Sequence, residues 1–356
     1  MLGLDKIIDL EPFSLEESEK NKIFSKALID LTKYHYNNCS KYKKIINLLE
    51  FSFKKKHSKE DMPFIPVNLF KDYDLMSVKR KEVFKILTSS GTTGTKLSKV
   101  FLDKINTFNQ KKVLSKIMSS FIGTQRLPLL IIDSKSVFEN RNKFSARAAA
   151  ILGFSIFGYD HTYALNEDLS LNIKALLKFY KKYKNKKFLI FGFTSIVWEK
   201  MCIELKKKNI SLDFSKAILL HGGGWKKLEK QNISNARFKE DLKKILKLNK
   251  IHNYYGMVEQ TGSIFIECEK CGNFITSIFS DILIRDKNFK LAKKGEKGLV
   301  QLISILPTSY PGHNIITEDI GEIVKDDSAC TCIHYGKRFK IHGRIKNAEI
   351  RGCSDI

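Results

Sequence analysis

The stretch "KFLIFGFTSIVWEKMCIELKKKNISLDFSKAILLHGGGW", residues 187–225, decides the fold class of this chain. Two short apolar runs, at 187–193 and 215–220, flank a segment whose apolar residues recur every three or four positions. Such runs are typical of strands buried on both faces, and the segment between them is typical of a helix. The stretch therefore predicts a β–α–β unit with parallel strands, and three glycines follow its second strand.

The same alternation continues on both sides of this unit. Upstream, residues 127–134 form an apolar run typical of a buried strand, and residues 169–185 have helical spacing. Downstream, residues 235–249 have helical spacing again, and strand-like segments dominate after about residue 262. This order predicts an α/β fold, in which a large domain has mixed and parallel sheets flanked by helices and a β-rich C-terminal part.

The first sixty residues have a different character. Apolar positions at helical spacing predict helices in residues 1–60, and Ser14 and Glu17 have the spacing of a capping box. We expect residues 1–60 to pack on a main domain of residues 61–342, and residues 343–356 to form a short tail.

Composition and charge restrict the class of protein. Hydrophobic residues make up 43% of the 356 residues, and no run of about 20 apolar residues predicts a membrane-spanning helix. The net charge of +25 permits attraction to nucleic acid, but the lysines are dispersed and no nucleic-acid-binding module is recognisable. The acidic N-terminal region is atypical of a signal peptide, and seven cysteines cannot all pair in disulfides. These features predict a cytoplasmic protein with reduced thiols.

A loop rich in glycine and hydroxyl residues, "LTSSGTTGTKLSK" at residues 87–99, lies between two strand-like runs. The spacing of its glycines differs from that of a Walker-type phosphate loop. Glycines nonetheless let backbone N–H groups approach a ligand closely, and hydroxyl groups donate to phosphate oxygens. The loop therefore predicts phosphate binding, with a flexible linker as the alternative. The candidate residues are Ser89, Ser90, Gly91, Thr92, Thr93 and Gly94.

Further motifs follow this loop in a fixed order: "HGGGW" at 221–225, "YYGMVEQTG" at 254–262, "TEDIG" at 317–321 and "HGRIKNAEIRG" at 342–352. Together they resemble the motifs of the adenylate-forming enzymes, which activate carboxylic acids as acyl-AMP. The longer segments "GGGWKK", "PTSYPGHNIITEDIG" and "AEIRGCSD" resemble more narrowly the LuxE-type acyl-protein synthetases, the long-chain-fatty-acid luciferin-component ligases. The resemblance covers the chain from about Pro66 to Ile356.

The resemblance implies where ATP and Mg²⁺ bind. The loop would hold the ATP phosphates, and Glu259 would hold Mg²⁺, a hard cation that prefers carboxylate and phosphate oxygens. Asp319 would contact the ribose hydroxyls, and Arg344 lies where the hinge of the family begins. The ATP-binding residues implied outside the loop are Gly222, Gly223, Gly224, Tyr255, Gly256, Asp319 and Arg344.

The resemblance also implies covalent chemistry at Cys353, within "IRGCSDI". In the LuxE-type family, a cysteine in this context takes the acyl group from acyl-AMP as a thioester and passes it to a partner reductase. A thiolate is a strong nucleophile, and Arg351 would lower its pKa; an incidental cysteine in a tail is the alternative. We expect the small C-terminal domain of the superfamily, with its lysine, to be absent, so that Lys96 or Lys99 would face the leaving pyrophosphate.

Four other cysteines form two close pairs, Cys268-x2-Cys271 and Cys330-x-Cys332. Two pairs of thiols in a reducing compartment are typical of a tetrahedral zinc site, and a glycine follows the first pair as in a zinc knuckle. Four unrelated reduced thiols are the alternative, and His334 is a weaker substitute ligand.

The sequence thus predicts an ATP-dependent enzyme that activates a carboxylic acid, specifically a fatty acid. The acyl group would then pass through Cys353 to an acyl-accepting protein, which is a reductase or a carrier. An acyl-CoA or acyl-carrier-protein ligase of the phenylacetate-CoA ligase kind, with Cys353 as a bystander, is the first alternative. A basic non-enzymatic nucleic-acid-binding protein is the second alternative. For His221 and His313 we expect structural roles, and for Cys39 and Cys202 places in the core.

Overall fold

The computed structural model describes residues 3–89, 96–138, 146–223, 228, 233–325 and 330–345. The chain forms two compact units: the first comprises Met1–Phe121 and Gly256–Ile350, and the second comprises Ile122–Tyr255 and Arg351–Ile356. The domain boundaries expected from the sequence, at residues 60 and 342, stay predictions. No helix within the described ranges has both the length and the apolar character needed to cross a bilayer.

The second unit is built on a parallel sheet whose strands lie in the order β5-β4-β6-β7-β8. In chain order the strands are β4 (Leu127–Ile132), β5 (Gly158–Tyr163), β6 (Phe188–Phe193), β7 (Ala217–Gly222) and β8 (Lys250–Tyr255). Every residue of β4, β6 and β7 is buried, which explains why these sequences are apolar apart from His221. The parallel sheet predicted from the alternation is therefore confirmed.

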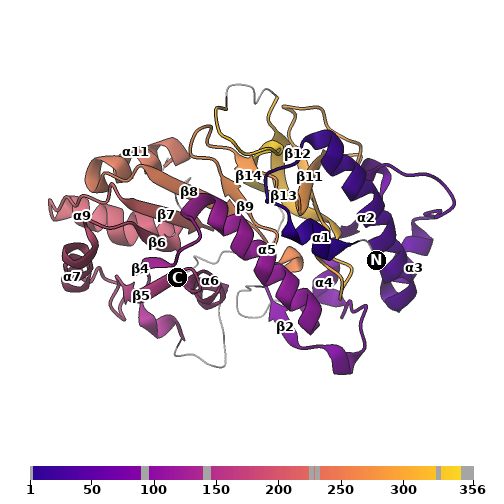
Figure 1. Ribbon diagram of the computed structural model, residues 1–356, viewed down its shortest axis with the longest axis horizontal. Coiled ribbons are helices and arrows are strands. Elements are labelled where there is room, and N and C mark those ends of the chain that lie inside the picture. The colour runs from indigo at the N-terminus through magenta and orange to yellow at the C-terminus, as the bar shows by residue number, and fades with distance from the viewer. Residues whose placement is uncertain are drawn as a thin grey trace. The chain divides into compact units, whose positions relative to one another are not determined.

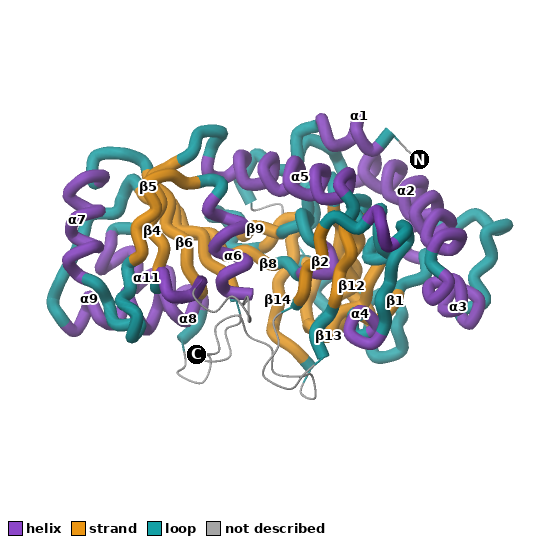
Figure 2. Tube along the Cα trace, turned by 90° about the horizontal axis from the view of Figure 1, so that it is seen from below, coloured by secondary structure: helices purple, strands orange, loops and turns teal. Residues whose placement is uncertain are grey.

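Helices cover both faces of this sheet. They are η3 (Lys135–Phe138), α6 (Ala146–Ser155), α7 (Ile173–Tyr183), α8 (Thr194–Ile196), η4 (Val197–Cys202), α9 (Ile203–Lys207) and α11 (Asn235–Leu246). Helix α6 lies on the face opposite to α9 and α11 (Figure 1, Figure 2). The chain passes from β4 outward to β5 and then returns past β4 to β6, β7 and β8. Because crossovers between parallel strands are right-handed, connections that run in opposite directions across the sheet place their helices on opposite faces.

The edge strand β5 is the element of this sheet that the sequence did not predict. Its residues Tyr159, Asp160 and His161 are exposed, so "GYDHTY" lacks the apolar run of the central strands. An edge strand has one neighbouring strand, so fewer of its side chains are covered. Its position beside β4 is therefore set by backbone pairing within the folded sheet and not by an apolar sequence of its own.

The first unit contains a mostly antiparallel sheet in the order β11-β12-β13-β14-β10-β9, to which β1 adds in parallel beside β13. Its strands are β1 (Ile65–Pro66), β9 (Phe265–Glu267), β10 (Phe274–Ile275), β11 (Ser280–Arg285), β12 (Gly298–Ser304), β13 (Asn314–Ile323) and β14 (Arg338–Arg344). A separate hairpin pairs β2 (Lys85–Thr88) with β3 (Lys99–Leu102). The β-rich C-terminal part is therefore confirmed.

The helices expected near the N-terminus are present. The helical segments of the first unit are α1 (Leu4–Asp9), α2 (Glu17–Asn38), α3 (Ser40–Leu48), η1 (Lys59–Asp61), α4 (Leu69–Asp72), η2 (Arg80–Glu82), α5 (Lys104–Ile122) and η5 (Val258–Gln260). The capping box expected at Ser14 is wrong, because α2 has Glu16 at its N-cap and the Ser14 hydroxyl donates to the Glu11 carbonyl. A local turn therefore takes the hydroxyl that would have capped the helix.

Helix α2 lies beside β11 (Figure 1), and a buried ion cluster joins the two elements. The Asp281 side chain on β11 is 1% exposed and lies 2.5 Å from the Lys59 ammonium, 3.1 Å from that of Lys337 and 3.6 Å from that of Lys20 on α2. Burial alone raises the pKa of Asp281, but the three ammonium groups outweigh it and hold that pKa well below its usual value. Burial also lowers the pKa of Lys20 to about 8.

A second buried polar group lies where α2 meets the segment before β13. The imidazole rings of His35 and His313 stack with centroids 4.9 Å apart, and both residues are fully buried. The Nε2 atom of His35 donates to the Pro307 carbonyl at 3.1 Å, so its Nδ1 atom accepts from the Ser77 hydroxyl at 2.7 Å. Burial lowers the pKa of His35 to about 3 and that of His313 well below its usual value. Both rings are therefore neutral in the folded protein at neutral pH, in agreement with a structural role for His313.

This pair predicts a loss of stability in mild acid. Because the folded-state pKa of each ring lies below its unfolded value, the unfolded chain binds more protons once the pH falls below about 6.5. We expect the free energy of unfolding to decrease from there toward pH 5, by up to about 1.4 kcal/mol per pH unit for each ring. Urea unfolding at several pH values measures the slope. His35→Phe should lower it by up to about 1.4 kcal/mol per pH unit, the contribution of one ring, whereas a control substitution at the exposed His161 should leave it unchanged.

Candidate active site

The glycine- and hydroxyl-rich loop connects the paired strands β2 and β3. At its base, the Ser89 N–H donates to the Ser98 carbonyl at 3.1 Å, and the Ser98 N–H donates to the Ser89 hydroxyl at 3.0 Å. The first bond continues the backbone pairing of the strands by one residue pair, and the second, to a side chain, also joins the two ends of the loop. Ser90, Gly91, Thr92, Thr93 and Gly94 lie outside the described residues.

The Glu259 carboxylate is buried in η5, with 3% of the residue exposed. Its Oε1 atom has no hydrogen-bond partner among the described residues. Burial raises the pKa of Glu259; the Ser98 hydroxyl and the Arg344 guanidinium oppose that shift, although no hydrogen bond of normal geometry joins Glu259 to Ser98. A buried, incompletely paired carboxylate costs folding free energy and is typical of a site that awaits a cation.

Neighbouring residues hold the backbone of Glu259 in place. The buried Gln260 amide donates to the Leu302 carbonyl at 3.0 Å and to the Gly312 carbonyl at 2.9 Å. A Cβ atom on Gly312 would lie 2.6 Å from the Glu259 carbonyl oxygen, so this close approach requires glycine. The sequence did not single out Gln260 or Gly312, and their only signal was their place within the quoted motifs "YYGMVEQTG" and "PTSYPGHN".

Asp319 and Arg344 face each other across two neighbouring strands. They are register partners on β13 and β14, and the Arg344 Nε atom lies 3.2 Å from the Asp319 Oδ1 atom. Both charges act on Glu259, since Arg344 lowers its pKa and Asp319 raises it. The first unit therefore brings together two carboxylates and a guanidinium, which can bind a divalent cation and hydroxyl groups.

The glycine-rich turn belongs to the second unit, at the carboxyl end of β7. A Cβ atom on Gly222 would lie 2.2 Å from the Tyr254 ring, and Gly223 has a φ of +97°, which disfavours other residues. His221 is fully buried beside Thr194, whose hydroxyl donates to the Gly222 carbonyl at 3.0 Å and lies 2.9 Å from the His221 Nδ1 atom. These contacts agree with a structural role for His221. Tyr255 ends β8, Gly256 follows it in the first unit, and Gly224 lies outside the described residues.

The two lysines near the loop lie at the surface. Lys96 pairs with Asp72 at 3.4 Å and Lys99 pairs with Asp74 at 3.7 Å, and all four side chains are largely exposed. Exposed pairs of this kind contribute little free energy. Neither lysine is therefore held in one position by its pair.

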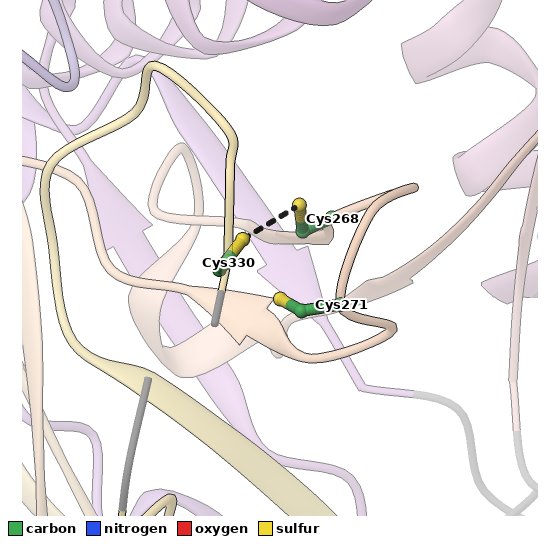
Figure 3. Close-up of side chains that lie close together, drawn as sticks. All are labelled: Cys268, Cys271 and Cys330. Carbon is green, nitrogen blue, oxygen red and sulfur yellow. Dashed lines mark hydrogen bonds between the residues drawn. The ribbon is translucent and has the colours of Figure 1, made fainter. Parts of the chain in front are cut away.

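Three of the four paired cysteines gather in the first unit (Figure 3). Cys268 follows β9, Cys271 lies in the turn toward β10, and Cys330 precedes β14; their sulfur atoms lie within 4.8 Å of one another. The Cys332 sulfur is not among these three atoms; it accepts a hydrogen bond from Arg338 Nη2 at 2.9 Å. The His334 ring packs against the rings of Phe13 and Phe121, at centroid distances of 4.7 and 4.9 Å.

The remaining cysteines are those predicted to be core residues or an acyl carrier. Cys39 and Cys202 are buried, as expected, and burial raises the pKa of both thiols. Cys353 lies outside the described residues, so its role stays a prediction.

Comparison with known proteins identifies relatives of this chain. Residues 3–356 match the family model of LuxE, acyl-protein synthetase. The chain is 23% identical over 364 residues to a long-chain-fatty-acid–luciferin-component ligase of Aliivibrio fischeri, with 98% of this chain and 92% of that protein covered. It is 22% identical over 347 residues to the ligase of the same name from Vibrio harveyi, with coverage of 94% and 87%.

Solved structures show the same fold. The open conformation of 2-hydroxyisobutyryl-CoA ligase, in complex with 2-HIB-AMP and CoA, matches 95% of this chain and 78% of its own chain at 14% identity, with a TM-score of 0.72. This likeness confirms the predicted α/β fold class of adenylate-forming ligases. Because the family model spans nearly the whole chain, the protein is an acid–thiol ligase that belongs to the LuxE family of acyl-protein synthetases.

Proposed function

We propose that this enzyme activates a long-chain fatty acid as acyl-AMP and carries the acyl group as a thioester on Cys353. Membership of the acyl-protein synthetase family supports the reaction class, and the names of the relatives from Aliivibrio fischeri and Vibrio harveyi support a fatty acid. The observation that carries the proposal is the buried Glu259 carboxylate beside Asp319 and Arg344.

The residues of the first unit fit ATP and Mg²⁺. Glu259 has a buried oxygen without a partner among the described residues, which suits a cation bound between a carboxylate and phosphate oxygens. Mg²⁺ bound there would neutralise negative charge on the phosphates. Asp319 would accept hydrogen bonds from the ribose hydroxyls, and its pairing with Arg344 holds the carboxylate in position.

The glycine- and hydroxyl-rich residues Ser89–Gly94 would donate to the ATP phosphates. Gly222–Gly224, with Tyr255 and Gly256, would bind the adenine. Besides Mg²⁺, the sequence predicts a structural zinc ion, for which the described part of the chain provides three clustered thiols.

The proposed reaction has two steps. A carboxylate oxygen of the fatty acid attacks the α-phosphorus of ATP, and pyrophosphate leaves with the electrons of the broken P–O bond. The Cys353 thiolate then attacks the acyl carbon, and AMP leaves as the thioester forms. The acyl group passes from there to an acyl-accepting protein, for which a reductase or a carrier is proposed. A non-enzymatic nucleic-acid-binding protein does not fit this family.

The acyl carrier can be tested by intact mass. After incubation with ATP, Mg²⁺ and a mixture of fatty acids, we expect the full-length protein to gain the mass of one acyl group, which hydroxylamine releases. Cys353→Ser should lose this gain completely but still catalyse fatty-acid-dependent ATP–pyrophosphate exchange. Cys39→Ala is the matched control, because Cys39 is buried and its raised pKa makes it a poor nucleophile.

Other outcomes separate the competing readings. A mass gain that persists in Cys353→Ser would place the thioester on another cysteine. No gain, but AMP release once CoA or a carrier protein is added, would favour an acyl-CoA or acyl-carrier-protein ligase. The absence of both adenylation and thioester formation would contradict the proposal as a whole.

A further inference from the structure

We infer that Cys268, Cys271, Cys330 and Cys332 bind a structural Zn²⁺ ion, at a place separate from the proposed ATP site. The first step is the spacing of the sulfur atoms. In a tetrahedral site with Zn–S bonds of about 2.3 Å, neighbouring sulfurs lie about 3.8 Å apart. The Cys268 and Cys330 sulfur atoms are 3.7 Å apart, although 62 residues separate them in the chain (Figure 3). That separation is much longer than the roughly 2.05 Å of a disulfide, so the thiols lie at the distance of co-ligands.

The backbone conformation of the turn that carries Cys268 and Cys271 fits metal binding. The Lys270 N–H points at the Cys268 sulfur at 3.4 Å, and the Gly272 N–H donates to the Cys268 carbonyl at 2.8 Å. Gly272 has a φ of +68°, a conformation in which a side chain is strained. Backbone N–H groups directed at sulfur stabilise the thiolate form that a metal requires.

Cys332 supplies the fourth sulfur. It lies two residues after Cys330 on the same segment, and its sulfur is hydrogen-bonded to the Arg338 guanidinium at 2.9 Å. Four thiolates around Zn²⁺ carry a net charge of −2, which the nearby guanidinium partly offsets. His334 is not the fourth ligand in this proposal, because its ring packs against the rings of Phe13 and Phe121.

The ion would link the turn after β9 to the segment before β14, which are otherwise connected in the sheet only through the short strand β10. β10 has two residues and pairs with β9 on one side and β14 on the other. A metal bound by the turn after β9 and by the segment before β14 would close this end of the sheet. β14 also carries Arg344, so the metal would fix the strand that presents the partner of Asp319. The inference itself does not depend on the proposed acyl transfer.

Metal content tests the site directly. The full-length protein, purified under reducing conditions without chelator, should contain one zinc per chain by elemental analysis. Cys271→Ser should lower that content at least tenfold, whereas Cys39→Ala, which removes a buried thiol elsewhere, should keep one zinc. Less than a tenth of an equivalent in the unmodified protein after zinc loading, or full zinc in Cys271→Ser, would overturn the inference.

Cobalt substitution tests the ligand set even if a variant folds poorly, because it uses the unmodified chain. The zinc-free, reduced protein titrated with Co²⁺ should show the visible bands of tetrahedral cobalt and a sulfur-to-cobalt charge-transfer band, saturating at one equivalent. Cys332→Ala should lower the charge-transfer intensity by about a quarter, because one of four thiolates is lost. Unchanged intensity in Cys332→Ala would overturn its assignment as the fourth ligand. Octahedral, pale spectra of the unmodified protein would overturn the site.

Discussion

Replacing Asp281 with Asn should destabilise the protein by about 3–5 kcal/mol, the usual effect of removing one partner from a buried ion pair. Asp281 is the carboxylate that faces Lys20, Lys59 and Lys337, and the side chains of Asp281 and Lys59 are almost completely buried. Without it, three ammonium groups lie close together away from water with no opposite charge at the centre. Urea unfolding at pH 7 measures the loss.

The pH dependence distinguishes this charge effect from a general packing defect. The pKa of Lys20 is already lowered to about 8, so above that pH the unfolded chain holds more protons than the folded one and stability rises with pH. In Asp281→Asn the pKa values of Lys20 and Lys59 should fall further and the raised pKa of Lys337 should fall as well, so the loss of stability should shrink as the pH rises from 7 to 10. Glu240→Gln, which removes an exposed partner of Lys244, is the control and should unfold like the unmodified protein. A loss that stays constant from pH 7 to 10 would contradict the electrostatic explanation.

Replacing Glu259 with Gln should lower the rate of fatty-acid-dependent ATP–pyrophosphate exchange by on the order of a hundredfold or more, as for other preorganised electrostatic groups. The amide keeps the size of the side chain but removes the charge that would hold Mg²⁺. The concentration of Mg²⁺ needed for half-maximal rate should rise as well. Steady-state exchange assays across a range of Mg²⁺ concentrations measure both effects.

The stability of the same variant separates a catalytic role from a structural one. Burial raises the pKa of Glu259, which means that the folded protein is destabilised by keeping this carboxylate charged at neutral pH. Glu259→Gln should therefore unfold at the same or a higher temperature than the unmodified protein. Glu322→Gln is the matched control, because Glu322 lies on β13 and pairs with Lys340 and His342, and its exchange rate should stay unchanged. A lower melting temperature for Glu259→Gln would show that the carboxylate is part of the folded framework.

The local pattern of apolar residues was sufficient to predict the strands that are buried on both faces of the sheet. The runs at β4, β6 and β7 are apolar apart from His221 because each is covered by helices, so the sequence itself displays their burial. The strand pair around the 87–99 loop was readable for a similar reason, since β3 has three buried residues in succession. Edge strand β5 and the cap of α2 were missed because their hydrogen bonds are made by the backbone or by a competing local turn.

The candidate active site was found through its motifs, but its geometry was not. The motif order suggested Glu259, Asp319 and Arg344, and the structure places their charges close enough to affect one another. Gln260 and Gly312 became visible only when Gln260 was seen to donate to carbonyls on or beside β12 and β13. The sequence alone does not indicate which backbone carbonyl a side-chain amide will contact in the folded protein.

The amino-acid sequence by itself determined the α/β class, the β-rich C-terminal part and the family, because periodicity and motif order are properties of neighbouring residues. Tertiary structure alone decided that Asp281 meets three lysines, that His35 stacks on His313, and that Cys268 and Cys330 approach to 3.7 Å. Each of these contacts joins residues far apart in the chain, so it exists only once the helices, turns and strands of the first unit have packed together.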